Sequence, residues 1–100
     1  MKSVVLSEGV KSIGFRAFLQ CRGLESLTIP ASVKRIEEFA FEGCGGLKSV
    51  TMCGERPEAK EKVFDKCDNL AAIHVPANAK SWAGMKEWQG IPLVFDAEAK

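Results

Sequence analysis

Cysteine, histidine and hydroxyl side chains, the residue types that can carry out chemistry, recur in this chain at a fixed interval. Cys21, Cys44 and Cys67 each lie 23 residues apart. Cysteines in a short chain can indicate disulfides or a metal site. A shared phase, however, stacks all three in one column, where thiols serve as small apolar residues. Stacked neighbours come close enough to pair, but a column of three leaves one over. We therefore expect reduced, buried thiols.

Metal and cofactor binding are not expected from these residues. The chain has no C-x-x-C pair, and His74 is its single histidine. A structural zinc site needs four such ligands. The glycine-rich stretch Gly43–Gly46 lacks the lysine of a phosphate-binding loop. The sequence therefore predicts no metal and no cofactor.

An enzyme built on this chain would pair His74 with Cys53 or with one of the regularly spaced serines. Nucleophilic catalysis requires a nucleophile, a base and an orienting group within hydrogen-bond reach. No acidic residue occupies an obvious orienting position, and a flat sheet offers no pocket that excludes water. We therefore expect no catalytic activity and interpret His74 as a surface imidazole.

The same interval of 23 residues governs the large apolar residues, and this defines the elements that position the polar ones. A period of this length with an L-x-x-L-x-L core is the signature of leucine-rich repeats. Four apolar columns share the interval: Leu24, Leu47 and Leu70; Val4, Leu27, Val50 and Ile73; Leu6, Ile29, Met52 and Val75; and Phe18, Phe41 and Phe64.

These columns predict one domain over residues 1–100, with an α/β repeat fold. We expect a leucine-rich-repeat solenoid of about four 23-residue units, with a parallel concave sheet and short outer helical turns. The outer turns are inferred from helix-like spacing, as between Phe15, Phe18 and Cys21. The predicted repeats, cap and tail are residues 1–23, 24–46, 47–69, 70–78, a C-terminal helical cap at 79–95, and a polar tail at 96–100.

The predicted cap contains Trp82, Met85 and Trp88, spaced by three residues. This spacing indicates a short helix with its large side chains on roughly one side. A solenoid must cover its last open core face, so the two tryptophans are interpreted as a lid. The alternative is an aromatic pair that binds a ligand.

The sequence resembles the BspA-like, or Treponema pallidum type, subclass of leucine-rich repeats, and in particular its C-terminal repeats. The unit of that subclass reads L-x-x-L-x-I-P-x-S-V-x-x-I-x-x-x-A-F-x-x-C-x-x. Positions of the second repeat that match it are Leu24, Leu27, Ile29, Pro30, Ser32, Val33, Ile36, Ala40, Phe41 and Cys44. A degenerate unit with Pro57, followed by Val75-Pro76-Ala77, matches the family's ending. The resemblance implies adhesion and protein binding, a cell-surface or secreted location, and no catalytic residues.

The overall charge limits the kinds of partner. The net charge is +1, with 46% hydrophobic and 27% charged residues. This charge builds no basic field for nucleic acid. No apolar run is long enough to span a bilayer, so no membrane insertion is expected. The start of the chain lacks the apolar core and cleavage site of a signal peptide, and it enters the first repeat at once, like the trimmed end of a longer protein.

Two polar rows are predicted to run across the concave strand face. One contains Ser3, Ser26, Ser49 and Ala72, and the other contains Val5, Thr28, Thr51 and His74. These rows either keep the sheet soluble while suiting β geometry or form a flat partner-binding surface. The candidate binding residues are Ser26, Thr28, Ser49, Thr51 and His74.

Two functions therefore remain open from the sequence. The chain is either a non-catalytic interaction and adhesion module that binds a protein or other macromolecule, or a purely structural capping segment of a longer solenoid. The N-terminal side has no lid comparable with the tryptophans, which leaves an open strand edge where self-association is possible.

Overall fold

The computed structural model describes residues 2–97, which form nine short strands and one 3-10 turn. Met1 and the last three residues of the predicted tail, 98–100, lie outside the described residues. The elements are β1 (Lys2–Val5), β2 (Ser12–Ile13), β3 (Leu24–Ile29), β4 (Arg35–Ile36), β5 (Ser49–Met52), β6 (Glu58–Ala59), β7 (Ala72–Pro76), η1 (Lys80–Trp82), β8 (Glu87–Trp88) and β9 (Ile91–Ala97).

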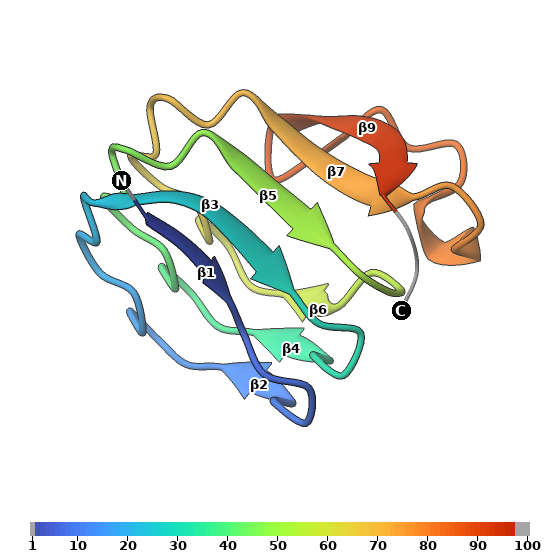
Figure 1. Ribbon diagram of the computed structural model, residues 1–100, viewed down its shortest axis with the longest axis horizontal. Helices are drawn as coiled ribbons and strands as arrows, with labels where there is room; N and C mark the ends of the chain where they lie inside the picture. Colours follow the sequence, from blue (N-terminus) through green and yellow to red (C-terminus); the bar gives the residue numbers. More distant parts are fainter. Residues whose placement is uncertain (1, 98–100) are drawn as a thin grey trace.

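The strands form two sheets that face each other across the core (Figure 1). A six-stranded sheet has the order β1-β3-β5-β7-β9-β8, and a three-stranded sheet has the order β2-β4-β6. All neighbouring strands are parallel except β8 and β9. Each turn of the chain adds one strand to each sheet, which makes a β-solenoid of about four turns. The predicted solenoid with its parallel sheet is confirmed.

The aromatic column shows how closely the turns stack. The rings of Phe18 and Phe41 lie 5.0 Å apart between centroids, and those of Phe41 and Phe64 lie 5.4 Å apart. Both distances are close to the spacing of hydrogen-bonded strands, about 4.7–4.9 Å. Phe41, in the middle of the column, is completely buried. Side chains at one phase of the repeat therefore form a continuous apolar ridge through the core.

The predicted outer helical turns are wrong, and with them the α/β class. Among the described residues the only helical element is η1, which has three residues. The outer segments are turns in which two residues per repeat adopt left-handed backbone angles. These residues are Arg16, Phe39 and Lys62 at the first position, and Gln20, Gly43 and Lys66 at the second. A left-handed residue ends a right-handed helix, so the helix-like spacing arises from successive hydrogen-bonded turns.

The predicted helical cap is also wrong, because residues 84–97 form a hairpin. Gly84 has φ +80°, which ends η1 after a single turn. β8 and β9 then pair antiparallel, with Trp88 opposite Ile91. The two-residue turn between them, Gln89 and Gly90, has positive φ at both positions, as type I′ hairpin turns require. β9 adds to β7 as a further parallel strand and runs past Phe95, the last residue of the predicted cap, to Ala97.

The hairpin and η1 together close the C-terminal end of the core. Trp82 is completely buried, and its indole N–H donates to the carbonyl of Gly54 at 2.9 Å. Trp88 continues the aromatic column, since its ring meets that of Phe64 edge-on at 6.2 Å and that of Trp82 at 5.3 Å. The Gln89 side chain bonds the last outer turn through Val63 N–H and the Lys60 carbonyl. The tryptophans thus cover the last core face, as a lid must.

Replacing Trp82 by alanine should lower the free energy of unfolding by about 3–5 kcal/mol, because a large buried side chain is lost. The Gly54 carbonyl also loses its donor. Urea denaturation followed by circular dichroism measures the change. Phe95→Ala is the matched control, since Phe95 is 39% exposed, and it should cost less than about 1 kcal/mol. Equal losses in the two variants would contradict the role of Trp82 as a lid.

Two substitutions in one column of left-handed residues should change stability in opposite directions. Lys66 has φ +60°, and Gly43 one turn earlier has φ +75°. Lys66→Gly should stabilise the fold by roughly 0.5–1 kcal/mol, because glycine adopts this conformation without steric cost. Gly43→Ala should destabilise it by about 1 kcal/mol, since its Cβ would also lie 3.0 Å from Gln20 Cγ. Thermal melts measure both; a stabilised Gly43→Ala variant would refute this explanation.

Candidate functional site

The predicted polar rows lie side by side on the face of the six-stranded sheet that points away from the core, here named the ladder face. Strand register aligns Ser3 with Ser26, Ser49 and Ala72. The second row aligns Val5 with Thr28, Thr51 and His74, and it continues to Val94 of β9. The alternation of side chains along a strand puts both rows on one face while Leu27, Val50 and Ile73 fill the core.

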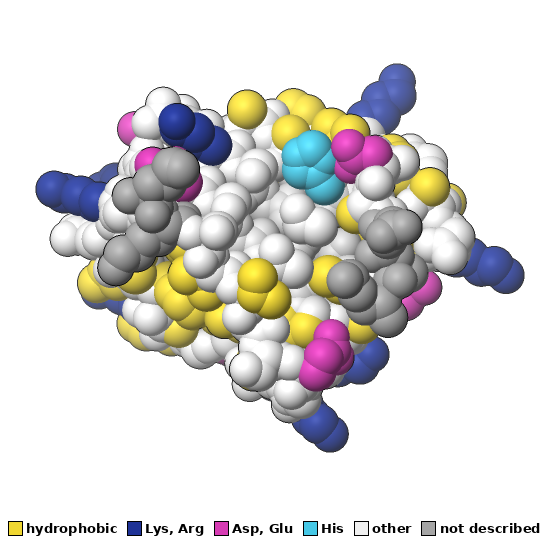
Figure 2. All heavy atoms as spheres, viewed as in Figure 1, with side chains coloured by type: hydrophobic (Ala, Val, Ile, Leu, Met, Phe, Trp, Pro, Cys, Tyr) yellow, Lys and Arg dark blue, Asp and Glu magenta, His cyan; other side chains and the backbone are white. Residues whose placement is uncertain are grey.

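All five candidate binding residues are half-buried at this face. No hydrogen bond within residues 2–97 uses the hydroxyls of Ser26, Thr28, Ser49 or Thr51. Figure 2 shows the middle of the face as largely uncharged, with lysine and arginine side chains at its periphery. The structure therefore brings the predicted residues together as a flat, neutral array of unused hydrogen-bonding groups.

His74 stands at one side of this array in contact with an acidic residue. Its Nδ1 lies 2.7 Å from Oδ1 of Asp96, and the two side chains touch in Figure 2. The expectation that no acid would orient His74 is wrong, because β9 pairs with β7 and brings Asp96 beside it. Both side chains are accessible, with exposed fractions of 31% for His74 and 58% for Asp96. The pair therefore offers a partner a donor and acceptor at a fixed position.

A hollow of about 390 Å³ lies where the second polar row meets the carboxyl ends of β1 and β3. Its lining residues are Val5, Leu6, Ser7, Glu8, Thr28, Pro30 and Cys53. Cys53 also lines a neighbouring hollow of about 250 Å³ with Gly54 and Asn78. Of the described residues, His74 lines neither hollow, so the proposed nucleophile and base do not share a pocket.

The cysteine column is a structural element of the core. Cys44 Sγ donates to the carbonyl of Phe18, and Cys67 Sγ donates to that of Phe41, each at 3.0 Å. Burial raises the pKa of Cys44, and it raises the pKa of Cys67 to about 12. Thiols held in the protonated form are weak nucleophiles. Cys21 is only half-buried, contrary to the prediction for the whole column, because no earlier repeat covers it.

The structure contains no assembled metal site or membrane-spanning helix in the portion it describes. Within residues 2–97, no group of three or more histidine, cysteine or acidic side chains is arranged to hold a metal ion. None of the described helical segments has the length and apolar character needed to cross a membrane. The four cysteines, all of them in the described range, form no disulfide.

The fold and the ladder face define a solenoid of the leucine-rich-repeat class. The sequence matches the family described as "BspA type Leucine rich repeat region (6 copies)" over residues 1–84, and the chain belongs to this family. Membership indicates a protein-interaction repeat module of a generally non-catalytic, typically surface-associated family. No significant match was found among curated proteins or among solved structures.

Sequence reasoning missed the contribution of β9 to the site. Val94 extends the second polar row by one strand, and Asp96 holds His74. The available signal was the pair Gln89-Gly90 between two apolar stretches, since glycine in a two-residue loop indicates a hairpin. The alternation of Leu93 with Val94 would then have assigned one residue to the core and the next to the ladder face.

The stability contributed by the Cys67 thiol should fall at alkaline pH. The pKa of Cys67 is about 12 in the folded protein, whereas an unfolded thiol ionises near pH 8.5. Because the unfolded state releases this proton first, the free energy of unfolding falls as pH rises between these values. Urea titrations from about pH 8 to about pH 11 should show the stability difference between wild type and Cys67→Ala shrinking. A difference that stays constant would contradict the burial of a protonated thiol.

Proposed function

We propose that this protein is a non-catalytic interaction module that binds a protein partner through the ladder face. The observation that carries the proposal is the alignment of four unused hydroxyls from Ser26, Thr28, Ser49 and Thr51 on two adjacent strands. Paired strands hold these groups at a fixed spacing of about 4.7–4.9 Å. A partner would therefore find a preorganised array, which reduces the entropy lost on binding.

The composition of the face favours a protein over other macromolecules. Hydroxyl hydrogen bonds contribute about 0.5–1.5 kcal/mol each, so several must act together. Exposed valines lie at both sides of the second row, with Val5 72% exposed and Val94 37% exposed. A mixture of apolar groups and neutral donors suits a protein surface, whereas nucleic acid would require a concentration of basic residues.

The proposed setting for this binding is adhesion at a cell surface or in a secreted protein. Support comes from the family, which is typically surface-associated. A rigid repeat sheet suits this role, because its side chains are held by the solenoid and not by mobile loops. In this proposal His74 and Asp96 provide the charged side of the contact.

A second candidate function is purely structural, as a segment that closes a longer solenoid at its C-terminal end. The observation in its favour is the complete cover over the last turn, where Trp82 is fully buried and Trp88 is 8% exposed. A terminal unit of this kind protects the core of the other repeats and needs no binding surface.

The double substitution Thr28→Lys and Thr51→Lys should abolish binding, because two ammonium groups would stand in the centre of the row. Wild type and variant are compared on an array of purified, immobilised proteins, and circular dichroism confirms that both are folded. The matched control is Glu38→Lys with Glu61→Lys, which adds lysines to two exposed outer-turn positions 23 residues apart. This control should bind like wild type.

Two outcomes would reject the ladder face as the site. In one, the threonine variant binds every partner as well as wild type, so that contact lies elsewhere. In the other, wild type binds no protein on the array, and the structural function is then the better account of the chain.

A further inference from the structure

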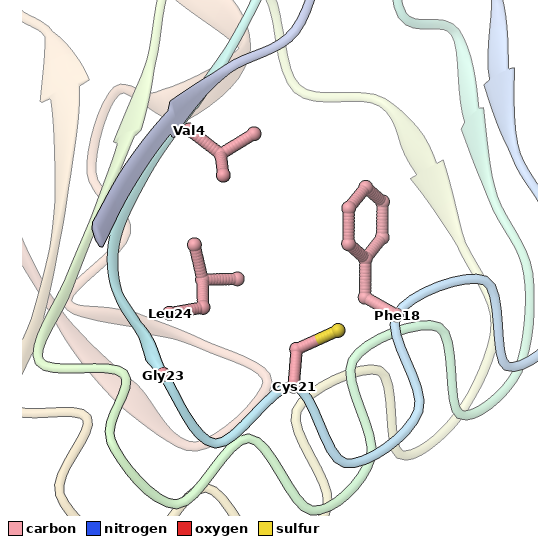
Figure 3. A pocket seen from close by; sticks show the side chains of 5 residues that line it. All are labelled: Val4, Phe18, Cys21, Gly23 and Leu24. Atoms are coloured by element: carbon pink, nitrogen blue, oxygen red, sulfur yellow. The ribbon is translucent and has the colours of Figure 1, made fainter. Parts of the chain in front are cut away.

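The N-terminal end of the solenoid exposes an apolar hollow, in contrast to the closed C-terminal end. The hollow has a volume of about 320 Å³ and is lined by Val4, Phe18, Cys21, Gly23 and Leu24. Figure 3 shows Val4 and Leu24 facing Phe18 and Cys21 across it. These residues come from β1, the start of β3 and the first outer turn, so the hollow is the uncovered end of the core itself.

The same positions one turn further along show what these residues contact when they are covered. Phe41 and Cys44 are both completely buried, whereas Phe18 and Cys21 are half-buried. Phe41 stacks on a ring at each side, but Phe18 stacks only on Phe41 among the described residues. The end of the core therefore lacks the apolar cover that every later turn receives from its neighbour. Leaving such a surface in water is unfavourable.

The backbone of β1 is open at this end as well. Leu6 donates its N–H to the carbonyl of Thr28 in β3. Peptide groups along a strand point alternately to its two sides, so the N–H groups of Ser3 and Val5 point to the outer edge. An exposed edge with free donors and acceptors is a template for pairing with another strand.

We propose that a second copy of this chain covers the N-terminal end, forming a two-fold dimer in which the two β1 strands pair antiparallel. The opposite end of the solenoid is closed by Trp82, Trp88 and Gln89. Head-to-tail stacking, which would build open filaments, is therefore blocked. Contact between two N-terminal ends is the arrangement in which both copies cover the same exposed surface, and it continues the interface that joins β1 to β3 within the chain.

The charges around this end suit an antiparallel arrangement. Glu8 follows the carboxyl end of β1, and Arg22 lies just before Leu24, which pairs with Lys2 at the start of β1. Antiparallel pairing brings the end of one strand beside the start of the other. Glu8 of each copy therefore faces the end of its partner that carries Arg22. The dimer joins the two six-stranded sheets, so that both ladder faces become one continuous surface.

The test is sedimentation velocity of the 100-residue chain over a range of concentrations, with variants at one edge position. Wild type should change from monomer to dimer as its concentration rises. Val5→Pro removes an outward N–H and leaves the bonds to β3 intact, as proline on an edge strand does, so it should remain monomeric. Val5→Thr is the matched control, because it keeps the N–H and the β-branched shape, and it should dimerise like wild type.

Amide hydrogen exchange measured by NMR provides a second readout that does not depend on a variant folding. The N–H groups of Ser3 and Val5 should exchange at least tenfold more slowly in concentrated than in dilute wild-type protein, while the exchange of outer-turn amides stays unchanged. A wild-type chain that remains monomeric at all concentrations would overturn the proposal and leave this end to a different partner. Dimers that persist in Val5→Pro, or exchange at Ser3 and Val5 that ignores concentration, would equally overturn it.

Discussion

Hydrogen bonds between equivalent positions of successive turns are the constraint on which the rest of this structure depends. The N–H of Phe18 donates to the carbonyl of Ala40, and that of Phe41 donates to the carbonyl of Val63, at 2.7 and 2.9 Å. These bonds satisfy backbone groups that one turn of chain could not satisfy alone. They also require every turn to have the same length. A residue type that suits one turn is consequently repeated in the next, and columns of identical side chains result.

This constraint explains which parts of the fold could be predicted. The core columns, the strands and the polar rows follow from two periods, two residues within a strand and 23 between strands. The outer turns and the cap were assigned to helices because a spacing of three or four residues is common to helices and to consecutive turns. What separates the two is backbone conformation, and left-handed angles at ordinary residues such as Arg16 and Lys62 leave no mark in the sequence.

The candidate site divides in the same way. Ser26, Thr28, Ser49 and Thr51 could be placed on one face because the repeat determines their register. Asp96 could not, because β9 follows a hairpin and its pairing with β7 is independent of the 23-residue interval. The orientation of His74 thus depends on a segment outside the repeat pattern. A residue whose position is set by tertiary pairing alone needs the structure to reveal its partner.

The two ends of the solenoid show how a periodic structure can be terminated. At the C-terminal end, side chains replace the backbone of a further turn: the Gln89 amide accepts from Val63 N–H at 3.4 Å and donates to the Lys60 carbonyl at 3.2 Å. No such replacement exists for β1 among the described residues. The ladder face differs from this open end, since its hydroxyls can remain hydrated at little cost without a partner. An apolar end has no equivalent in water, so pressure to associate acts on it at all times, whereas binding at the ladder face depends on the partner present.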